Sequence, residues 1–323
     1  NTALQNITSG TNNVAIGNGA GLGNAEQSEN VYIGYLAGYR NSKGTGVVHI
    51  GADAGAYTTG SRNVFVGQRA GQGGTGDSTP YASGEDNVAI GYEALDDFTT
   101  GHDNVAVGRW ALTSLTTGDY TTAVGLSAGS NVTTGRFNTF YGYNAGGNSN
   151  SSHVVAIGYN VYGSGASNKA YGVYIGSNAG RYDTSGEATI AIGYNAVACD
   201  SGGGNNPSNS IGIGNGALSG INGQARSNIG IGGTALNNVT NGEYNTAVGA
   251  NVGSTLTTGD NNVLIGKDAD VSAAAGTNQI VIGQGATGKG NNQTVIGNSS
   301  QTKVTISGSG VELATHPHNN TTA

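Results

Sequence analysis

The stretch "NNVAIGNGAG" at residues 12–21 decides the fold, because close variants of it return along the whole chain. Three of these variants are "NVYIGYLAG" at 30–38, "NVFVGQRAG" at 63–71 and "NVLIGKDAD" at 262–270. A chain that repeats one phrase at a regular period stacks equivalent structural units instead of building a single irregular core. The sequence therefore predicts a repeat architecture.

A glycine after a three-residue apolar stretch marks each copy of the repeat. These glycines stand at positions 17, 34, 51, 67, 91, 108, 125, 142, 158, 176, 193, 214, 232, 249, 266, 283 and 297, and most steps are 16 to 18 residues. The steps from 67 to 91 and from 193 to 214 are longer, and "NTALQ" at 1–5 resembles a degraded further copy. We assign residues 1–297 to the repeat shaft and 298–323 to a C-terminal exit segment.

The first and third residues of each triplet are mostly Val or Ile, as in Val14 and Ile16. Alternating β-branched residues before a glycine predict a very short strand, and we expect both positions to face the core. Ala usually follows three residues after the glycine and is the expected inward residue of a second short strand. In six copies a "TTG"-like turn precedes the next triplet, and its glycine is expected at positive φ. Asn often opens the triplet and is expected to bond to the backbone of stacked turns.

The predicted fold is an all-β parallel solenoid of about 17 rungs. At ~4.8 Å per rung the rod is roughly 80 Å long. The middle residue of the triplet should then point outward, yet it is uncharged in every copy and mostly apolar, as in Tyr32, Phe65 and Ala89. A strand that is apolar on both faces is usually buried on both faces, which predicts a parallel homo-oligomer. A monomer with a flat, Ala-rich side is the alternative.

The triplet pattern with its following "G-x-x-A" resembles the head repeats of YadA-like trimeric autotransporter adhesins. "TTGDNNVLIG" and "NTAVGANVG" are also similar to the repeat shafts of bacteriophage tail fibres, and the likeness covers residues 1 to about 300. The resemblance implies a left-handed parallel β-roll made by three chains. Steps near 17 residues favour the viral form over the autotransporter form. "NQTVIGNSSQTKVTISGSG" resembles the exit from such arrays, which tail fibres often continue into a self-cleaving chaperone.

Composition excludes several classes of partner. The net charge of −7 with few charged residues argues against nucleic acid and anionic membranes, and no apolar run reaches the ~20 residues that span a bilayer. The chain has no signal peptide or initiator Met, so we expect a processed product or a fragment. The single cysteine, Cys199, excludes an intrachain disulfide and is expected to be inert.

Little in the sequence points to catalysis, and we expect no enzyme activity, cofactor or assigned metal site. Asp96 and Asp97 are adjacent and would point to opposite faces of a strand, so a solvated turn is the favoured interpretation. Asp268 and Asp270 could share Ca²⁺, but the nonapeptide calcium-roll signature is missing. His316 and His318 would bring six imidazoles together in a trimer and could bind a transition metal, whereas a frayed polar end is the alternative.

Binding is expected where the chain departs from the repeat. Residues 71–86 and 197–210 should form loops outside the shaft. Aromatic rings concentrate before residue 195, and rings with polar tips suit contacts with sugars or proteins. The candidates for ligand contact follow the repeat glycine by one or two residues, and filling of grooves between subunits is the alternative role for them: Tyr35, Tyr92, Trp110, Tyr143, Tyr159 and Tyr194.

The expected function is adhesion by a homotrimeric fibre, as part of a phage tail fibre on the virion surface. The expected partners are the chain itself and a cell-surface glycan or protein receptor. A bacterial surface adhesin that binds host or matrix ligands is the alternative. A glycan-degrading tailspike would need a groove with paired carboxylates, and an ice-binding solenoid would need an uninterrupted Thr ladder.

Overall fold

The computed structural model describes residues 3–74, 81–147, 150–162, 171–183, 186–199 and 204–303. In these residues the chain forms a parallel β-solenoid of short strands and turns without a helix. The strands are β1 (Val14–Ile16), β2 (Val31–Ile33), β3 (Val48–Ile50), β4 (Val64–Val66), β5 (Val88–Ile90), β6 (Val105–Val107), β7 (Thr122–Val124), β8 (Thr139–Tyr141), β9 (Val155–Ile157), β10 (Val173–Ile175), β11 (Ile190–Ile192), β12 (Ile211–Ile213), β13 (Ile229–Ile231), β14 (Thr246–Val248), β15 (Val263–Ile265), β16 (Ile280–Ile282) and β17 (Thr294–Ile296).

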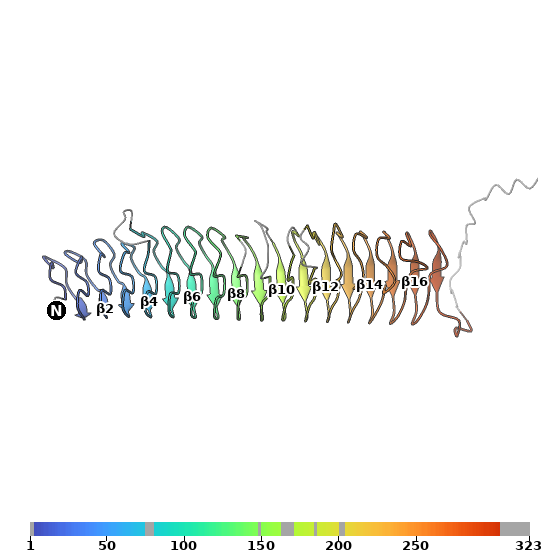
Figure 1. Ribbon diagram of the computed structural model, residues 1–323, viewed down its shortest axis with the longest axis horizontal. Helices are drawn as coiled ribbons and strands as arrows, with labels where there is room; N and C mark the ends of the chain where they lie inside the picture. The colour runs from blue at the N-terminus through green and yellow to red at the C-terminus, as the bar shows by residue number, and fades with distance from the viewer. Residues whose placement is uncertain are drawn as a thin grey trace, which may run out of the picture.

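Every strand pairs in parallel and in register with the strands before and after it, so that Val31 lies between Val14 and Val48. The long steps along the sequence are also single rungs, because β4 pairs with β5 and β11 with β12. Figure 1 shows the result, a rod with all strands along one side. The predicted all-β parallel solenoid is confirmed.

The predicted orientation of the triplet is wrong. The middle residue faces the interior, where Tyr32, Phe65 and Ala89 are fully buried, whereas the first and third residues are partly or largely exposed. The Ala three residues after the glycine is buried, as in Ala37, but it lies in a turn and not in a second strand. Each rung therefore contributes one strand residue to the core.

The interior of a rung is narrow. Two side chains share it: the middle residue of the triplet and the residue six positions later. Where the middle is Tyr32 or Phe65, that position is Gly38 or Gly71, and a Cβ there would collide with the ring. In several rungs with a small middle residue, the same position is large and fully buried, as with Leu95 after Ala89 and Leu218 after Gly212. Where both are small, as with Ala123 and Gly129, side chains of the neighbouring rungs fill the space, here Leu112 and Phe140. Because close-packed interiors tolerate neither voids nor overlap, a β-branched pair would not fit inside. This volume limit explains why the middle residue points inward.

The glycines of the "TTG" turns do not have positive φ, contrary to expectation. They are required instead by close approach of the next rung. A Cβ on Gly118 would collide with the carbonyl oxygen of Gly135, and one on Gly259 with that of Gly276. Positive φ occurs at the glycine after each strand, where Gly34 has a φ of 137° and Gly266 of 128°.

A column of buried Asn side chains precedes many of the strands and ties neighbouring rungs together, as expected. In the rungs of β13 to β15, Asn245 donates its Nδ2 hydrogens to the Asn228 side chain at 3.0 Å and the Gly259 carbonyl at 2.9 Å. Its Oδ1 accepts from the backbone N–H of Asn262 at 3.0 Å. Each such side chain satisfies backbone groups that strands of three residues leave unpaired.

Replacement of Asn245 by Ala tests this column. The buried Gly259 carbonyl and Asn262 N–H each lose a partner, so we expect destabilisation by about 2 kcal/mol or more. Chemical denaturation followed by circular dichroism measures this loss. The control is Asn238→Ala, which removes one exposed hydrogen bond and should have a much smaller effect. Equal effects of both variants would contradict the role of the column.

His49 in β3 gives a second test of the core. Its ring is buried between Tyr32 and Phe65, neither ring nitrogen has a hydrogen-bond partner, and burial lowers the pKa of His49 from 6.5 to about 3. The unfolded chain therefore binds one more proton than the folded chain between pH 6.5 and 3, and stability falls as pH drops through that window. His49→Phe should raise the melting temperature and more so at pH 4 than at pH 7. An equal shift at both pH values would show that the ring does not titrate in this way.

Candidate functional site

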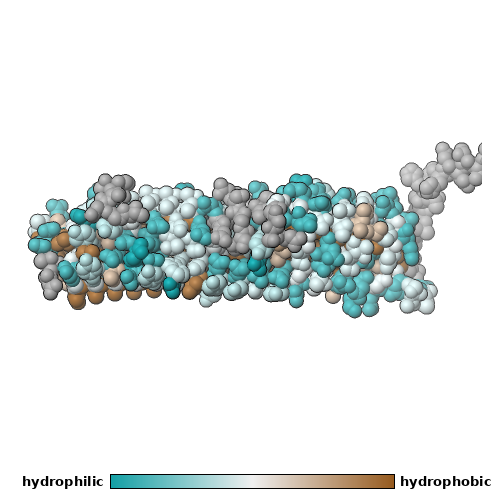
Figure 2. Space-filling view, in the orientation of Figure 1, coloured by the Kyte–Doolittle hydropathy of each residue, from teal (hydrophilic) through white to brown (hydrophobic). Residues whose placement is uncertain are grey.

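The most extensive candidate surface is the outer face of the sheet. It carries two columns of aliphatic side chains, one from the first and one from the third residue of each triplet. In the middle and C-terminal strands Ile90, Val248 and Ile265 remain about two-fifths exposed, at 41%, 38% and 40%. Figure 2 shows apolar residues in a row along the lower edge of the N-terminal part, on the side of the rod where Figure 1 places the strands.

The area of this face exceeds that of an ordinary monomer surface patch. Seventeen strands at ~4.8 Å, each about 10 Å long, make a flat strip of about 800 Å². The largest apolar patch on a typical monomer covers about 300–600 Å², and one side of a stable protein interface about 800 Å². Thr122, Thr139, Tyr141, Thr246 and Thr294 are the non-aliphatic members of the two columns. The face therefore has the size and the chemistry of an interface.

The predicted ligand-contact residues do not form one continuous stripe. Tyr35, Tyr92, Tyr143, Tyr159 and Tyr194 are exposed and follow the repeat glycine directly, whereas Trp110 belongs to the adjacent column. Two contacts between their rings bring some of them together: Tyr143 stacks on Tyr159 with ring centroids 5.2 Å apart, and Tyr92 meets Trp110 edge-on at 6.4 Å. Tyr35 and Tyr194 lie in rungs away from both pairs.

Trp110 lies in the most highly connected polar cluster. Its Nε1 donates to Glu93 Oε2 at 2.8 Å, and the Arg109 guanidinium lies 3.7 Å over its ring. Glu93 also pairs with Arg69, which reaches Asp96 at 2.8 Å. These partners fix the indole of Trp110 in a structural network, whereas its φ of 61° is shared by the same position in other rungs, such as Asp53 and Asn251.

Asp96 and Asp97 lie in a turn as predicted, but the expectation that both are solvated is wrong for Asp96. Asp96 is nearly inaccessible and its Oδ1 has no hydrogen-bond partner, whereas Asp97 is exposed. Burial raises the pKa of Asp96 to about 7, against the opposing effect of Arg69. The two carboxyls therefore do not share one solvent-accessible site.

The remaining sequence candidates lie apart from one another. Asp268 accepts from Asn251 at 2.9 Å and Asp270 from Ser254 at 3.0 Å, so protein donors already occupy both carboxylates. Cys199 is buried. His316 and His318 lie outside the described residues, as do 75–80 and 200–203 of the two predicted loops. In the described part of the chain no group of three or more His, Cys, Asp or Glu side chains could hold a metal ion.

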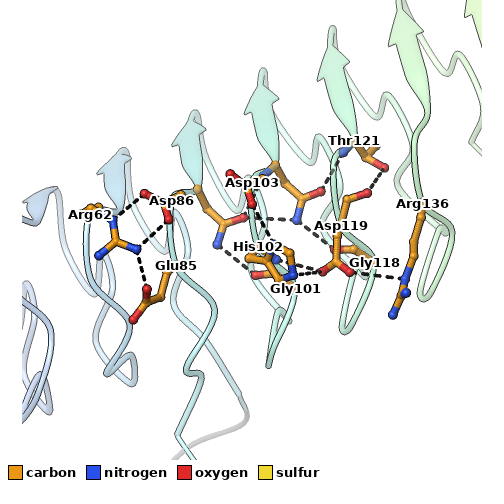
Figure 3. Close-up of polar contacts among 12 residues, drawn as sticks. Arg62, Glu85, Asp86, Gly101, His102, Asp103, Gly118, Asp119, Thr121 and Arg136 are labelled. Atoms are coloured by element: carbon orange, nitrogen blue, oxygen red, sulfur yellow. Dashed lines mark hydrogen bonds and ion pairs between the residues drawn. The ribbon is translucent and has the colours of Figure 1, made fainter.

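Figure 3 shows a charged stretch in the turns before β4 to β8. Arg62 pairs with Glu85 and Asp86, and Asp119 Oδ2 lies 3.3 Å from Arg136 Nε. A shallow pocket of about 320 Å³ opens here, lined by Ser83, Gly84, Glu85, Asp86, Thr100, His102 and Asp103. Arg62 and Arg136 each have a carboxylate beside them and Asp103 lies against the His102 ring, and this arrangement is typical of a solvated surface.

One column of side chains was not predicted from the sequence. Two residues before the triplet, four successive rungs carry Tyr120, Phe137, His153 and Tyr171, and their rings stack at centroid distances of 4.9 to 5.1 Å. We call these four residues the aromatic ladder. Its signal in the sequence is an aromatic residue at one repeat position in consecutive copies.

Comparison of the chain with protein-family models, curated proteins and solved structures found no match. Among the described residues no helix is long and apolar enough to cross a membrane. What the surface can do therefore follows from its geometry and chemistry alone.

Asp96 provides the pH test of this region. Because its folded pKa of about 7 exceeds the unfolded value of 3.8, ionisation costs stability as pH rises from 4 to 7. Asp96→Asn should therefore stabilise the rod at pH 8 relative to pH 4 in thermal melts. Asp268→Asn is the opposite control, because Asn251 and Lys267 lower the pKa of Asp268 and its loss should cost stability at pH 8. The same sign for both variants would rule out burial of Asp96 as the dominant influence on its ionisation.

Proposed function

We propose that the chain is a segment of a parallel homotrimeric fibre that acts by adhesion. One observation carries the proposal: the outer face of the sheet holds two largely aliphatic columns that the chain itself leaves partly exposed. Contact with further copies would cover a largely apolar strip with a footprint of about 800 Å² per chain. The sequence suggests an oligomer because the middle residue of each triplet is apolar. The proposal relies instead on the first and third residues, which are the ones that face outward.

The arrangement of the columns fits a closed ring of parallel chains. Identical rung spacing lets two parallel copies meet rung for rung along their whole length. Around a threefold axis, the column containing Ile265 in one chain can contact the column containing Val263 in the next. Such a head-to-tail contact closes after three copies and leaves no aliphatic column in water.

A rod of this kind serves as a stiff spacer or a repeated contact surface. We propose the tail fibre of a virus as its location, since the repeats resemble those shafts, with a bacterial surface adhesin as the alternative. Immunogold electron microscopy with antibody against the chain separates the two, because label on virions supports the first and label on bacterial cells the second. In either setting three identical copies would add weak contacts by avidity.

Lysine substitution in the outer face tests the assembly. The double variant Val248→Lys/Ile265→Lys places two charges per chain in the proposed contact, and desolvating them without partners is costly. We expect the wild type to sediment as a trimer at micromolar concentration and the variant as a monomer with an unchanged circular dichroism spectrum.

The matched control is Thr258→Lys, in the exposed turn on the other side of the β15 rung. It should leave the trimer intact. A wild-type chain that sediments as a monomer, or a double variant that remains trimeric, would refute the proposal.

A further inference from the structure

The aromatic ladder occupies a column in which the backbone is unfavourable for large side chains. Its members have φ of 55°, 57°, 60° and 67°, in the left-handed region that favours Gly and Asn. Other rungs of the same chain place Asn at this position with the same backbone: Asn12, Asn209, Asn261, Asn278 and Asn292. Asn thus occupies this column in five rungs and charged residues such as Arg62 and Asp86 in others, and the departure to stacked aromatic rings covers four consecutive rungs.

Packing into the core does not explain this departure. Tyr120, Phe137 and Tyr171 are 50%, 49% and 66% exposed, and His153 is exposed as well. Because the positive φ is common to the whole column, it is the exposed run of four large rings on this unfavourable backbone that points to a role in binding. Their position on the surface leaves them accessible to a ligand.

The stack leaves one ring face uncovered. Along most of the ladder each ring is covered by its neighbours: Phe137 lies between Tyr120 and His153, with interplanar angles of 6° and 16°. At one end Tyr171 stacks on His153 at 5.0 Å, and the next rung in register carries only Ala188. Among the residues that the structure describes, the far face of Tyr171 therefore meets the methyl group of Ala188 and no further ring.

From the rung spacing, the rung of Ala188 leaves room for one ring between the side chains of the two flanking rungs. The rung after Ala188 carries Asn209 in the same register, also exposed and at a φ of 58°. Tyr171 and Asn209 are two rungs apart, roughly 9.6 Å, so a flat ring between them would lie about 4.8 Å from each. That separation matches the spacing of the rings already stacked in the ladder.

The groups around this slot differ in chemistry. Tyr171 offers an apolar π-face on one side, and Asn209 offers an amide on the other. The exposed side chain of Glu187 stands next to Ala188. A pyranose ring has the complementary character, with an apolar C–H face and hydroxyls at its rim that bond to amides and carboxylates.

We propose that the slot over Ala188, between Tyr171 and Asn209, binds one pyranose ring of a glycan. The rest of the ladder fixes the orientation of Tyr171, which lowers the entropy lost on binding. This inference gives the proposed adhesive function a ligand class and rests on that function for its biological role. Its geometry is independent of the number of chains in the fibre.

The test uses saturation-transfer NMR of the full chain with the methyl β-pyranosides of galactose, glucose, mannose and N-acetylglucosamine. At least one should receive saturation at the C–H face of its ring. Tyr171→Asn and Ala188→Tyr should each weaken this sugar at least tenfold. The first removes the π-face, and the second fills the slot with a fifth ring of the ladder.

Tyr35→Asn is the control, because Tyr35 is an exposed ring in the β2 rung, outside the column of the ladder and far from the slot. It should leave binding unchanged. Since Asn suits the backbone of the ladder's column, Tyr171→Asn should melt at the wild-type temperature or above it.

Three results would overturn the proposal: no saturation of any of the four sugars, equal binding by Ala188→Tyr and wild type, or a clearly lower melting temperature of Tyr171→Asn. A change in the sedimentation of Tyr171→Asn would assign the ladder to contact between protein copies instead. A wild-type monomer that still saturates a sugar would contradict the trimer alone.

Discussion

In-register stacking of the rungs is the constraint on which the rest of the structure depends. Because strand residues lie directly above their counterparts, each repeat position becomes a column along the rod. A side chain then has the same kind of neighbour on both sides, as Asn245 has with Asn228 and Asn262. The buried Asn column, the aliphatic face and the aromatic ladder are three consequences of this one register.

The period and the strand positions could be predicted from the sequence because they depend on local chemistry. Short β-branched triplets and a following glycine are sufficient to place every strand. Which side of the triplet faces inward depends on the volume inside a rung, and a single triplet does not reveal it. The pairing of Tyr32 with Gly38, and of Gly212 with Leu218, carries that information over six residues. A search for compensating sizes at this spacing favours the correct orientation in most rungs, with exceptions such as Ala123 and Gly129.

In the candidate site, too, residue types could be predicted from the sequence, whereas three-dimensional contacts could not. The Tyr residues that follow the repeat glycine could be found by type and position, but the contacts among them could not, since Arg109 and Glu93 determine how Trp110 lies. The aromatic ladder was missed because its position lies outside the triplet, where Asn and charged residues are more common. Its meaning depends on backbone conformation, which the sequence does not show at a residue such as Phe137.

Periodicity also limits where function can arise in such a rod. Interior positions must fit their neighbours, and the Asn column must bond to its neighbours, so neither can vary freely. Side chains in the outer columns have no such requirement. Where a residue there lowers the stability of the rod, the residue must contribute something else, such as contact with a partner. Tyr171 is costly at its backbone position and only partly covered, whereas Val263 and Ile265 are costly because they expose apolar surface to water. Both kinds of cost are offset if each surface meets a partner, the aliphatic columns another chain and the open ring face a sugar. A single open ring face binds weakly, and a fibre with several copies of it gains strength from their number.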